Sequence, residues 1–323
     1  MVRLNRDIIL AAIVVAMVAA IGFITPPFVT PRSLVSLFND TAILIMVALG
    51  QMTVILTKSI DLSPGANIAL TGVLVALANA AYPEVPVPLL MLMATGIGLG
   101  LGAFNGAMVW LVGIPPIVVT LGTLSIFRGL SFVASGGTSI VGRQMSESFI
   151  AIPRAEFLWL PTMSWFAIVV VVLFAFGMRT TRTGRAFFAA GGNPTAAVYT
   201  GIDVGRTQFV AFCISGAIAG FCGYLWVSRY TIAYVDIAGG FELQVIAACV
   251  IGGVSIAGGI GTVAGVVLGA LFLGVVKNAL PVIHISPFWQ LAISGAAILG
   301  AVIINSGRER RAGRLILKEA AAS

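Results

Sequence analysis

Long apolar runs separated by short polar stretches make up most of the chain. Ten runs approach the roughly 20 residues that an α-helix needs to cross a bilayer at 1.5 Å per residue. They cover residues 8–25, 41–57, 64–81, 89–112, 117–135, 160–178, 207–228, 241–257, 260–280 and 287–305. This pattern predicts an all-α, polytopic membrane protein with about ten transmembrane helices.

Two pairs of neighbouring runs are separated by very short breaks, at residues 58–65 and 254–261. Each break is either a full turn outside the membrane or a break within it. Backbone at membrane depth is tolerated only where protein or a water-filled cavity satisfies its polar groups. Some of the ten helices are therefore expected to be broken. Residues 26–40, with three prolines, are expected to include a short amphipathic helix at the outer interface.

Composition strengthens the membrane prediction. The 323 residues are 59% hydrophobic and only 9% charged, whereas soluble domains carry about 25% charged residues. This excludes a soluble enzyme, a nucleic-acid-binding protein and a disordered protein, and residues 1–323 are expected to form one transmembrane domain. The charged start before the first apolar run could belong to a signal peptide, but the run is long, and an uncleaved first span is expected.

The positive charges predict the topology. Ten spans place both termini on one side, and twelve Lys and Arg residues then lie on that side against four in the opposite loops. Positive charge collects in cytoplasmic loops. Both termini are therefore expected to be cytoplasmic. Residues 179–206 then form the longest cytoplasmic loop.

The sequence offers no catalytic or metal-binding constellation. The chain has a single histidine, His284, and no cluster with metal-ligand spacing. None of its three lysines follows a glycine, so the nucleotide-binding loop G-x-x-x-x-G-K-[ST] does not occur. We expect that this chain is not an enzyme and that it binds no metal or cofactor.

Small residues recur at helical spacing. Glycines four residues apart let helix backbones approach closely in lipid, where dispersion drives association. They are Gly98, Gly102 and Gly106, then Gly216 and Gly220, then Gly261, Gly265 and Gly269. Close packing of many helices suits a transporter without identifying one.

The cytoplasmic loop contains a predicted short helix. Asn193 can cap a helix whose first residue is Pro194, and Gly201 can end it. This helix is either a solvated connector or a docking helix for a soluble motor. Within the spans, Asn67 and Asn105 either bond neighbouring helices or face a cavity, and Arg128 either reaches the interface or faces a cavity.

Six short stretches in order resemble the permease subunits of bacterial carbohydrate-uptake ABC importers, of the ribose/xylose/rhamnose type within the branched-chain-amino-acid/ribose permease family. The matching stretches are 60–63 (Ile-Asp-Leu-Ser) with Gly65, 105–106, 114–124, 128–129, 184–202 with its Gly-Gly-Asn-Pro, and 251–253 with 258–259. The chain departs from the family at Lys58-Ser59, where Gly-Gly is common, and at Pro64, where valine is common. Residues 191–197 and 278–283 look most like the rhamnose branch.

The resemblance implies a function for specific residues. It implies ATPase coupling through Arg182, Gly184, Arg185, Gly191, Gly192, Asn193, Pro194, Ala197 and Gly201. It implies a substrate pathway along Asp61, Asn67, Asn105, Thr120, Thr123, Arg128 and Gln244.

The resemblance also implies the assembly. We expect a multi-pass protein of the bacterial inner membrane, paired with a second copy or a paralogue. A separate ABC subunit would hold ATP and Mg²⁺, and a periplasmic protein would deliver a monosaccharide, with rhamnose as the first candidate. The alternative is an ion-coupled secondary carrier for a small polar solute, although the spans contain few acidic residues.

Overall fold

The computed structural model describes residues 6–282 and, beyond them, 286, 288–289, 292–293, 295–296 and 299–300. Eight described helices are long and apolar enough to span a membrane. They are α1 (Arg6–Ile24), α2 (Pro31–Leu56), α3 (Pro64–Ala81), α4 (Val87–Trp110), α5 (Pro116–Ser135), α7 (Thr162–Thr180), α10 (Val204–Tyr230) and α12 (Val263–Val282). The all-α, polytopic fold class is confirmed. Of the other two predicted spans, 241–257 contains the shorter helix α11 (Phe241–Ile251), and 287–305 lies largely outside the described residues.

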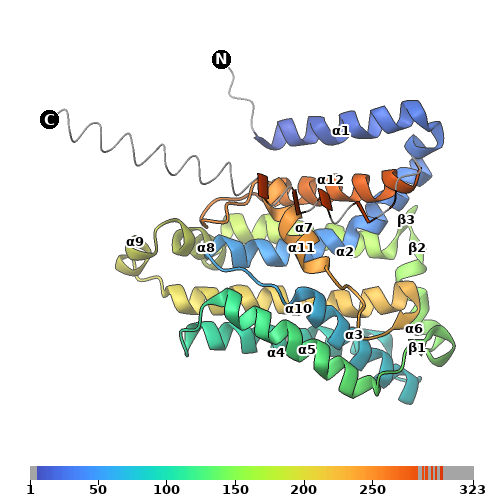
Figure 1. The fold of residues 1–323 in the computed structure, drawn as a ribbon, viewed down its shortest axis with the longest axis horizontal. Helices are drawn as coiled ribbons and strands as arrows, with labels where there is room; N and C mark the ends of the chain where they lie inside the picture. The colour runs from blue at the N-terminus through green and yellow to red at the C-terminus, as the bar shows by residue number, and fades with distance from the viewer. Residues whose placement is uncertain are drawn as a thin grey trace.

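Short elements gather at the two ends of the bundle (Figure 1). One end carries α8 (Arg182–Gly192) and α9 (Pro194–Tyr199), and we call it the inner end. The other, the outer end, carries α6 (Glu147–Ala151) and four two-residue strands. The strands are β1 (Ile140–Val141), β2 (Glu156–Phe157), β3 (Leu160–Pro161) and β4 (Ile232–Ala233), and 3₁₀ turns cover Pro26–Val29, Gly142–Gln144 and Ile152–Arg154. The pairs β1–β4 and β2–β3 are antiparallel.

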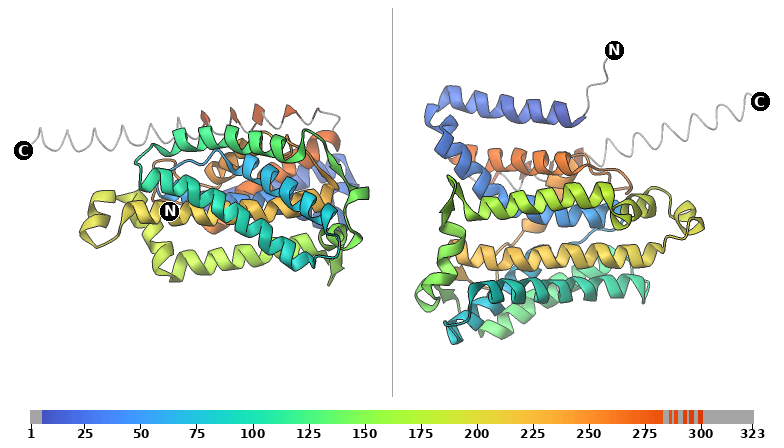
Figure 2. Two further views of the ribbon diagram at one scale, coloured as in Figure 1. Left: turned by 90° about the horizontal axis from the view of Figure 1, so that it is seen from below. Right: turned by 180° about the vertical axis from the view of Figure 1, so that it is seen from behind.

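The core lies around α2, α3 and α10. These three are the most buried of the eight spanning helices, whereas α1 lies along one side of the bundle with only Leu10 and Val14 buried (Figure 2). The first described residues of α1 lie near the inner end, because Asp7 accepts a hydrogen bond from Thr262 at 2.9 Å. A helix that is apolar on every face and is still exposed is suited to contact with lipid.

The predicted close packing through small residues is confirmed for α4 and α10, which run antiparallel. A Cβ atom at Gly98 would collide with the backbone of Gly216 and Gly220, and one at Gly102 would collide with Phe212 and Gly216. The two backbones therefore pack without intervening side chains. Asn67 joins both helices to α3, because its amide donates to the carbonyls of Gly98 (3.3 Å) and Gly216 (3.4 Å).

Two expectations about local structure need correction or refinement. The separate amphipathic helix expected within 26–40 is wrong, because α2 continues without a break from Pro31 to Leu56. The break at 254–261 is a turn that follows the short helix α11, which crosses the bundle at a steep angle to its neighbours (Figure 1). An apolar run reports burial or lipid contact, and it carries no information about the direction in which the helix runs.

Candidate functional site

The loop at the inner end folds into two consecutive helices whose starts are capped by side chains. The Thr181 hydroxyl accepts the Gly184 N–H at the start of α8, at 3.0 Å. The Asn193 side-chain oxygen accepts the Ala196 N–H at the start of α9, also at 3.0 Å. The sequence predicted the second cap, and it is confirmed.

The end of α9 also follows the sequence prediction. The helix stops at Tyr199, and Gly201 adopts a left-handed conformation with φ of +83°. Glycine is suited to this position because it lacks the Cβ that makes a positive φ unfavourable. The predicted coupling residues Arg182, Gly184, Arg185, Gly191, Gly192, Asn193, Pro194, Ala197 and Gly201 thus all lie on α8, on α9 or at their ends.

The end of α8 is packed directly against the interior breaks of the bundle. A Cβ atom at Gly191 would overlap the carbonyl oxygen of Leu56 and would approach the Gly259 nitrogen to 2.7 Å. The Gly259 N–H itself donates to the Leu56 carbonyl at 2.9 Å. We call this three-way contact of Gly191, Leu56 and Gly259 the glycine junction. It joins the loop to the end of α2 and to the turn before α12.

From the glycine junction the chain turns back into the bundle. Residues 57–63 are not helical, and they run back along the last turns of α2 toward α3. Gln51 of α2 donates its side-chain amide to the Asp61 carbonyl at 3.1 Å. Gln208 of α10 donates to the Thr57 carbonyl at 3.1 Å. The first short break is therefore an inward-running segment, which we call the inner segment, and its backbone groups bond to neighbouring helices as membrane depth requires.

Buried polar side chains converge on the inner segment. The Asp61 carboxylate accepts both the backbone N–H (2.8 Å) and the hydroxyl (2.7 Å) of Ser63. Asn105 of α4 donates to that hydroxyl at 2.9 Å. Thr120 of α5 donates to the Ile60 carbonyl at 3.2 Å. Asp61, Ser63 and Asn105 form one hydrogen-bonded cluster beside Thr120, and Asp61, Asn105 and Thr120 are at most 2% exposed.

A second non-helical segment enters from the outer end. Residues 231–240 descend from the end of α10 to the start of α11, and we call them the outer segment. Arg128 of α5 holds it, because its Nη1 donates to the carbonyls of Val235 and Ile237, both at 2.6 Å. The Asp236 carboxylate is 4.0 Å away and mostly exposed, so that ion pair adds little.

The two segments meet inside the bundle at the start of α3. A Cβ atom at Gly65 would collide with the Ala238 carbonyl and with the Glu242 carboxylate. Glycine at this position thus lets the outer segment and α11 approach the start of α3. Backbone from opposite ends of the bundle comes together at one interior point.

The predicted pathway residues divide into two groups in the structure. Asp61, Asn67, Asn105 and Thr120 surround the inner segment and the start of α3, and Thr123 lies one turn further along α5. Arg128 holds the outer segment. Gln244 is separate from these, in a small recess near the outer end that Trp226 and Tyr230 also line.

The sequence analysis gave no role in coupling or in the pathway to four residues that the structure places at the site: Ser63, Gln51, Gln208 and Leu56. The spacing of Asp61 and Ser63 was a usable signal, because an Asp side chain commonly accepts the N–H two residues onward. Three buried side-chain atoms have no hydrogen-bond partner among the described residues: Gln51 Oε1, Asn105 Oδ1 and Ser215 Oγ. Within the described residues, no group of three or more His, Cys, Asp and Glu side chains could hold a metal ion.

Comparison with known proteins decides the class. Residues 33–302 match the family model described as the permease component of branched-chain amino acid transport systems. The chain belongs to this permease family. The permease is 34% identical to the D-allose transport system permease protein AlsC of Escherichia coli (strain K12). The 294 aligned residues cover 91% of this chain and 89% of the relative.

A second relative has a different named cargo. The permease is 35% identical over 309 residues to the Autoinducer 2 import system permease protein LsrC of Enterobacter sp. (strain 638), across 95% of this chain and 88% of the relative. No solved structure matches the permease significantly.

These findings decide the general predictions about the class of protein and its location. The relatives are permease subunits, which are transport components rather than enzymes, so the prediction of a transport subunit is confirmed. The family and the eight apolar helices indicate a multi-pass protein of the inner membrane. An ABC importer of this kind works with an ATPase and a solute-binding protein. The two relatives are named for allose and autoinducer 2, so the prediction of a rhamnose permease remains a proposal.

Proposed function

We propose that this permease passes a monosaccharide into the cytoplasm, and that ATP hydrolysis on a partner subunit drives the step through the glycine junction. The observation that carries this proposal is the direct contact of Gly191 with Leu56 and Gly259. A contact between backbones has no flexible side chain to absorb a displacement. Movement of α8 and α9 is therefore passed to the inner segment.

The proposed route from the loop to the interior is short. Residues 57–63 begin at the junction and end at Ser63, whose hydroxyl bonds both Asp61 and Asn105. A shift of the inner segment would change this buried cluster and the packing of α3 against the outer segment at Gly65. The two segments would then open alternately, one to each side of the membrane, as broken helices do in other transporters.

The interior offers unused hydrogen-bonding capacity for a sugar. A buried polar atom without a partner costs about 1–3 kcal/mol, so the unpaired atoms of Gln51, Asn105 and Ser215 favour a state in which hydroxyl groups reach them. Asp61, Asn67, Asn105, Thr120, Thr123, Arg128 and Gln244 are the proposed pathway residues. Weak binding there is expected, because specificity would lie in the sugar-binding partner.

The proposed assembly follows from the same reasoning. Residues 179–206 form the proposed coupling loop, with ATP and Mg²⁺ bound by the ATPase and no cofactor bound by the permease itself. A second permease, identical or paralogous, would complete the pathway. The allose relative supports a hexose-sized cargo, and rhamnose is the first sugar to test.

Reconstitution tests the proposal directly. The permease is placed in vesicles with its ATPase and its sugar-binding protein, and ATP hydrolysis and sugar uptake are measured together for rhamnose, allose and ribose. Hydrolysis that rises only with one sugar and its binding protein supports the proposal and names the cargo.

Two other outcomes would overturn the proposal. Uptake on a sodium or proton gradient without ATP would support the ion-coupled carrier that the sequence left as the alternative. If a solute that is not a sugar stimulates ATP hydrolysis, the protein is still an importer subunit, but its cargo is not a monosaccharide.

A further inference from the structure

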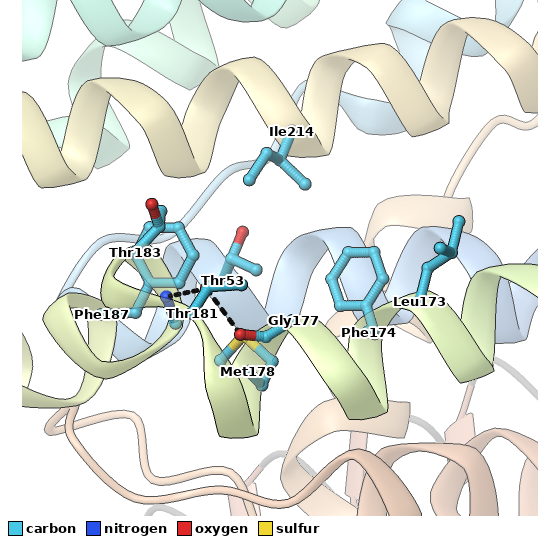
Figure 3. A pocket seen from close by; sticks show the side chains of 10 residues that line it. Thr53, Leu173, Phe174, Gly177, Met178, Thr181, Thr183, Phe187 and Ile214 are labelled. Carbon is cyan, nitrogen blue, oxygen red and sulfur yellow. Dashed lines mark hydrogen bonds between the residues drawn. The ribbon is translucent and has the colours of Figure 1, made fainter.

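An apolar cleft lies between α7 and α10, next to the coupling loop (Figure 3). It has a volume of about 170 Å³. Ile214 of α10 faces Leu173 and Phe174 of α7 across it, α2 forms its base, and α8 closes its inner end. An apolar space of roughly 150 Å³ is enough to hold a small hydrocarbon, so this open cleft can hold part of an acyl chain.

Two of the three threonine hydroxyls that line the cleft are already bonded to the protein, and the third belongs to Thr183 at the inner end. The Thr53 hydroxyl donates to the Gly50 carbonyl at 2.7 Å. The Thr181 hydroxyl donates to the Gly177 carbonyl at 2.7 Å and caps α8. The cleft therefore presents mainly hydrocarbon, which fits an apolar chain better than a sugar or a nucleotide.

The cleft opens onto a surface suited to lipid. Val172, Leu173 and Phe176 of α7 are 59–64% exposed, although α7 is long and apolar enough to span the membrane. In a multi-pass membrane protein, such a surface contacts acyl chains. The opening of the cleft is continuous with it through Leu173, so a chain can enter sideways from the bilayer.

Three arginines are sequence neighbours of residues that line the inner end of the cleft, and one of them, Arg185, donates to the Thr180 carbonyl at 2.8 Å. Arg179 follows the lining residue Met178, Arg182 lies between Thr181 and Thr183, and Arg185 follows Gly184. All three are exposed, and no salt bridge to a carboxylate joins any of them within the part of the chain that the structure describes. With the coupling loop on the cytoplasmic side, as the positive charges predict, these arginines belong to the side of the inner leaflet.

We propose that the cleft between α7 and α10 binds one anionic phospholipid, with an acyl chain against Ile214 and Phe174 and the phosphate near Arg179, Arg182 and Arg185. The shape of the cleft selects a hydrocarbon chain, and the charges select an anionic headgroup over a zwitterionic one. The proposal rests on the membrane location of the chain and not on its cargo. The lipid would contact the coupling loop directly through Phe187 of α8.

Two variants separate the acyl chain from the headgroup. Gly177→Leu fills the cleft, because a Cβ at Gly177 meets no heavy atom within 4 Å. Gly100→Leu on α4 is its matched control, because Gly100 is equally open. Arg179→Gln removes one charge beside the cleft, and Arg206→Gln removes one charge elsewhere at the inner end.

Native mass spectrometry of the full-length permease, titrated with phosphatidylglycerol or phosphatidylcholine, measures the binding. We expect one tightly bound phosphatidylglycerol per chain and at least tenfold weaker binding of both lipids in Gly177→Leu. We expect Arg179→Gln to weaken the binding of phosphatidylglycerol, and not of phosphatidylcholine, by about fivefold, which is the effect of one cation near a membrane surface. Both controls should bind as the wild type does.

Three results would overturn the proposal. Gly177→Leu could bind phosphatidylglycerol as tightly as Gly100→Leu. Gly177→Leu could change the oligomer mass without changing lipid binding, which would make this face a contact between permease copies. If Gly177→Leu does not insert into the membrane, the wild type and Arg179→Gln still test the headgroup site. That site is rejected if both proteins bind phosphatidylglycerol and phosphatidylcholine equally tightly. None of these results alters sugar-stimulated hydrolysis in the wild type, so they leave the proposed transport function separately testable.

Discussion

Two non-helical segments enter the bundle from opposite ends, and they are held in different ways. The inner segment, residues 57–63, is held by buried side chains from α2, α4 and α5 and by the half-buried Gln208 of α10. The outer segment, residues 231–240, is held chiefly by Arg128, which bonds the Val235 and Ile237 carbonyls. The two segments meet at Gly65.

The difference indicates how each segment is controlled. The inner segment is continuous with the glycine junction and thus with the coupling loop, so its position depends on α8. The outer segment has no such contact, and it is fixed by the half-buried Arg128 together with the pairing of β4 with β1. We infer that ATP-driven movement acts on the inner segment first, and that the outer segment responds through its contact with the start of α3.

The largest effect is expected at the glycine junction. Gly191→Ala should lower sugar uptake and sugar-stimulated hydrolysis at least tenfold, because the added methyl group would overlap the Leu56 carbonyl. Gly100→Ala is the matched control, because Gly100 lies on α4 outside the coupling loop and a Cβ there meets no heavy atom within 4 Å. Uptake is measured in reconstituted vesicles after equal insertion is verified. Equal loss in both variants would mean that helix flexibility, and not the junction, matters.

The next effect is expected at the outer segment. Arg128→Ala removes two hydrogen bonds from a charged donor, each worth about 1.5–3 kcal/mol, and transport should fall about tenfold. Arg128→Lys should restore transport only in part, because a lysine ammonium lacks the rigid fork of a guanidinium. Normal transport by the alanine variant at normal expression would show that Arg128 is an interfacial cation without this role.

A matched pair of asparagines sharpens the comparison. Asn105 donates to Ser63 at 2.9 Å in the interior, and Asn79 donates to Ser146 at the same distance at the outer end. Asn79→Ala should lower stability by about 2 kcal/mol, because Asn79 also accepts the Ser146 N–H, and Asn105→Ala by about 1 kcal/mol, both measured as a shift in the thermal midpoint. Only Asn105→Ala should also lower uptake, by about fivefold. Equal uptake in the two variants would separate the buried cluster from transport.

The smallest effect is expected at the cap of α9. Asn193→Ala removes the side-chain acceptor for the Ala196 N–H, which is worth about 1 kcal/mol of local helix stability. The affinity of the permease for its ATPase should fall severalfold in a pull-down titration. Asn193→Asp keeps a capping oxygen and should bind like the wild type, and a failure of this rescue would point to a direct contact of the Asn193 amide.

The sequence predicted those features that depend on local chemistry. Apolar runs located the described spanning helices, and Asn193, Pro194 and Gly201 predicted α9 because caps are set by neighbouring residues. The glycine spacing predicted close packing, although it did not reveal that α4 and α10 are the partners. The position of the first break was also evident from Lys58 and Asp61.

Features that depend on long-range contacts were not predictable. Gln208 and Thr57 are 151 residues apart in the chain, and no local pattern connects them. The sequence did not decide whether Arg128 reaches the membrane interface or faces the interior. The two alternatives differ only in which distant carbonyls its side chain bonds. Helix α8 was not predicted either, since its glycines disfavour a helix and its packing against α7 and the glycine junction stabilises it.

Hydrogen exchange of the inner segment in the assembled importer tests the central claim most directly. The amides of residues 57–63 are followed with and without bound ATP, in the wild type and in Gly191→Ala. We predict that ATP changes exchange in the coupling loop of both proteins, and in the inner segment of the wild type only. If the loop of the wild type responds to ATP while residues 57–63 stay unchanged, the glycine junction does not transmit the movement.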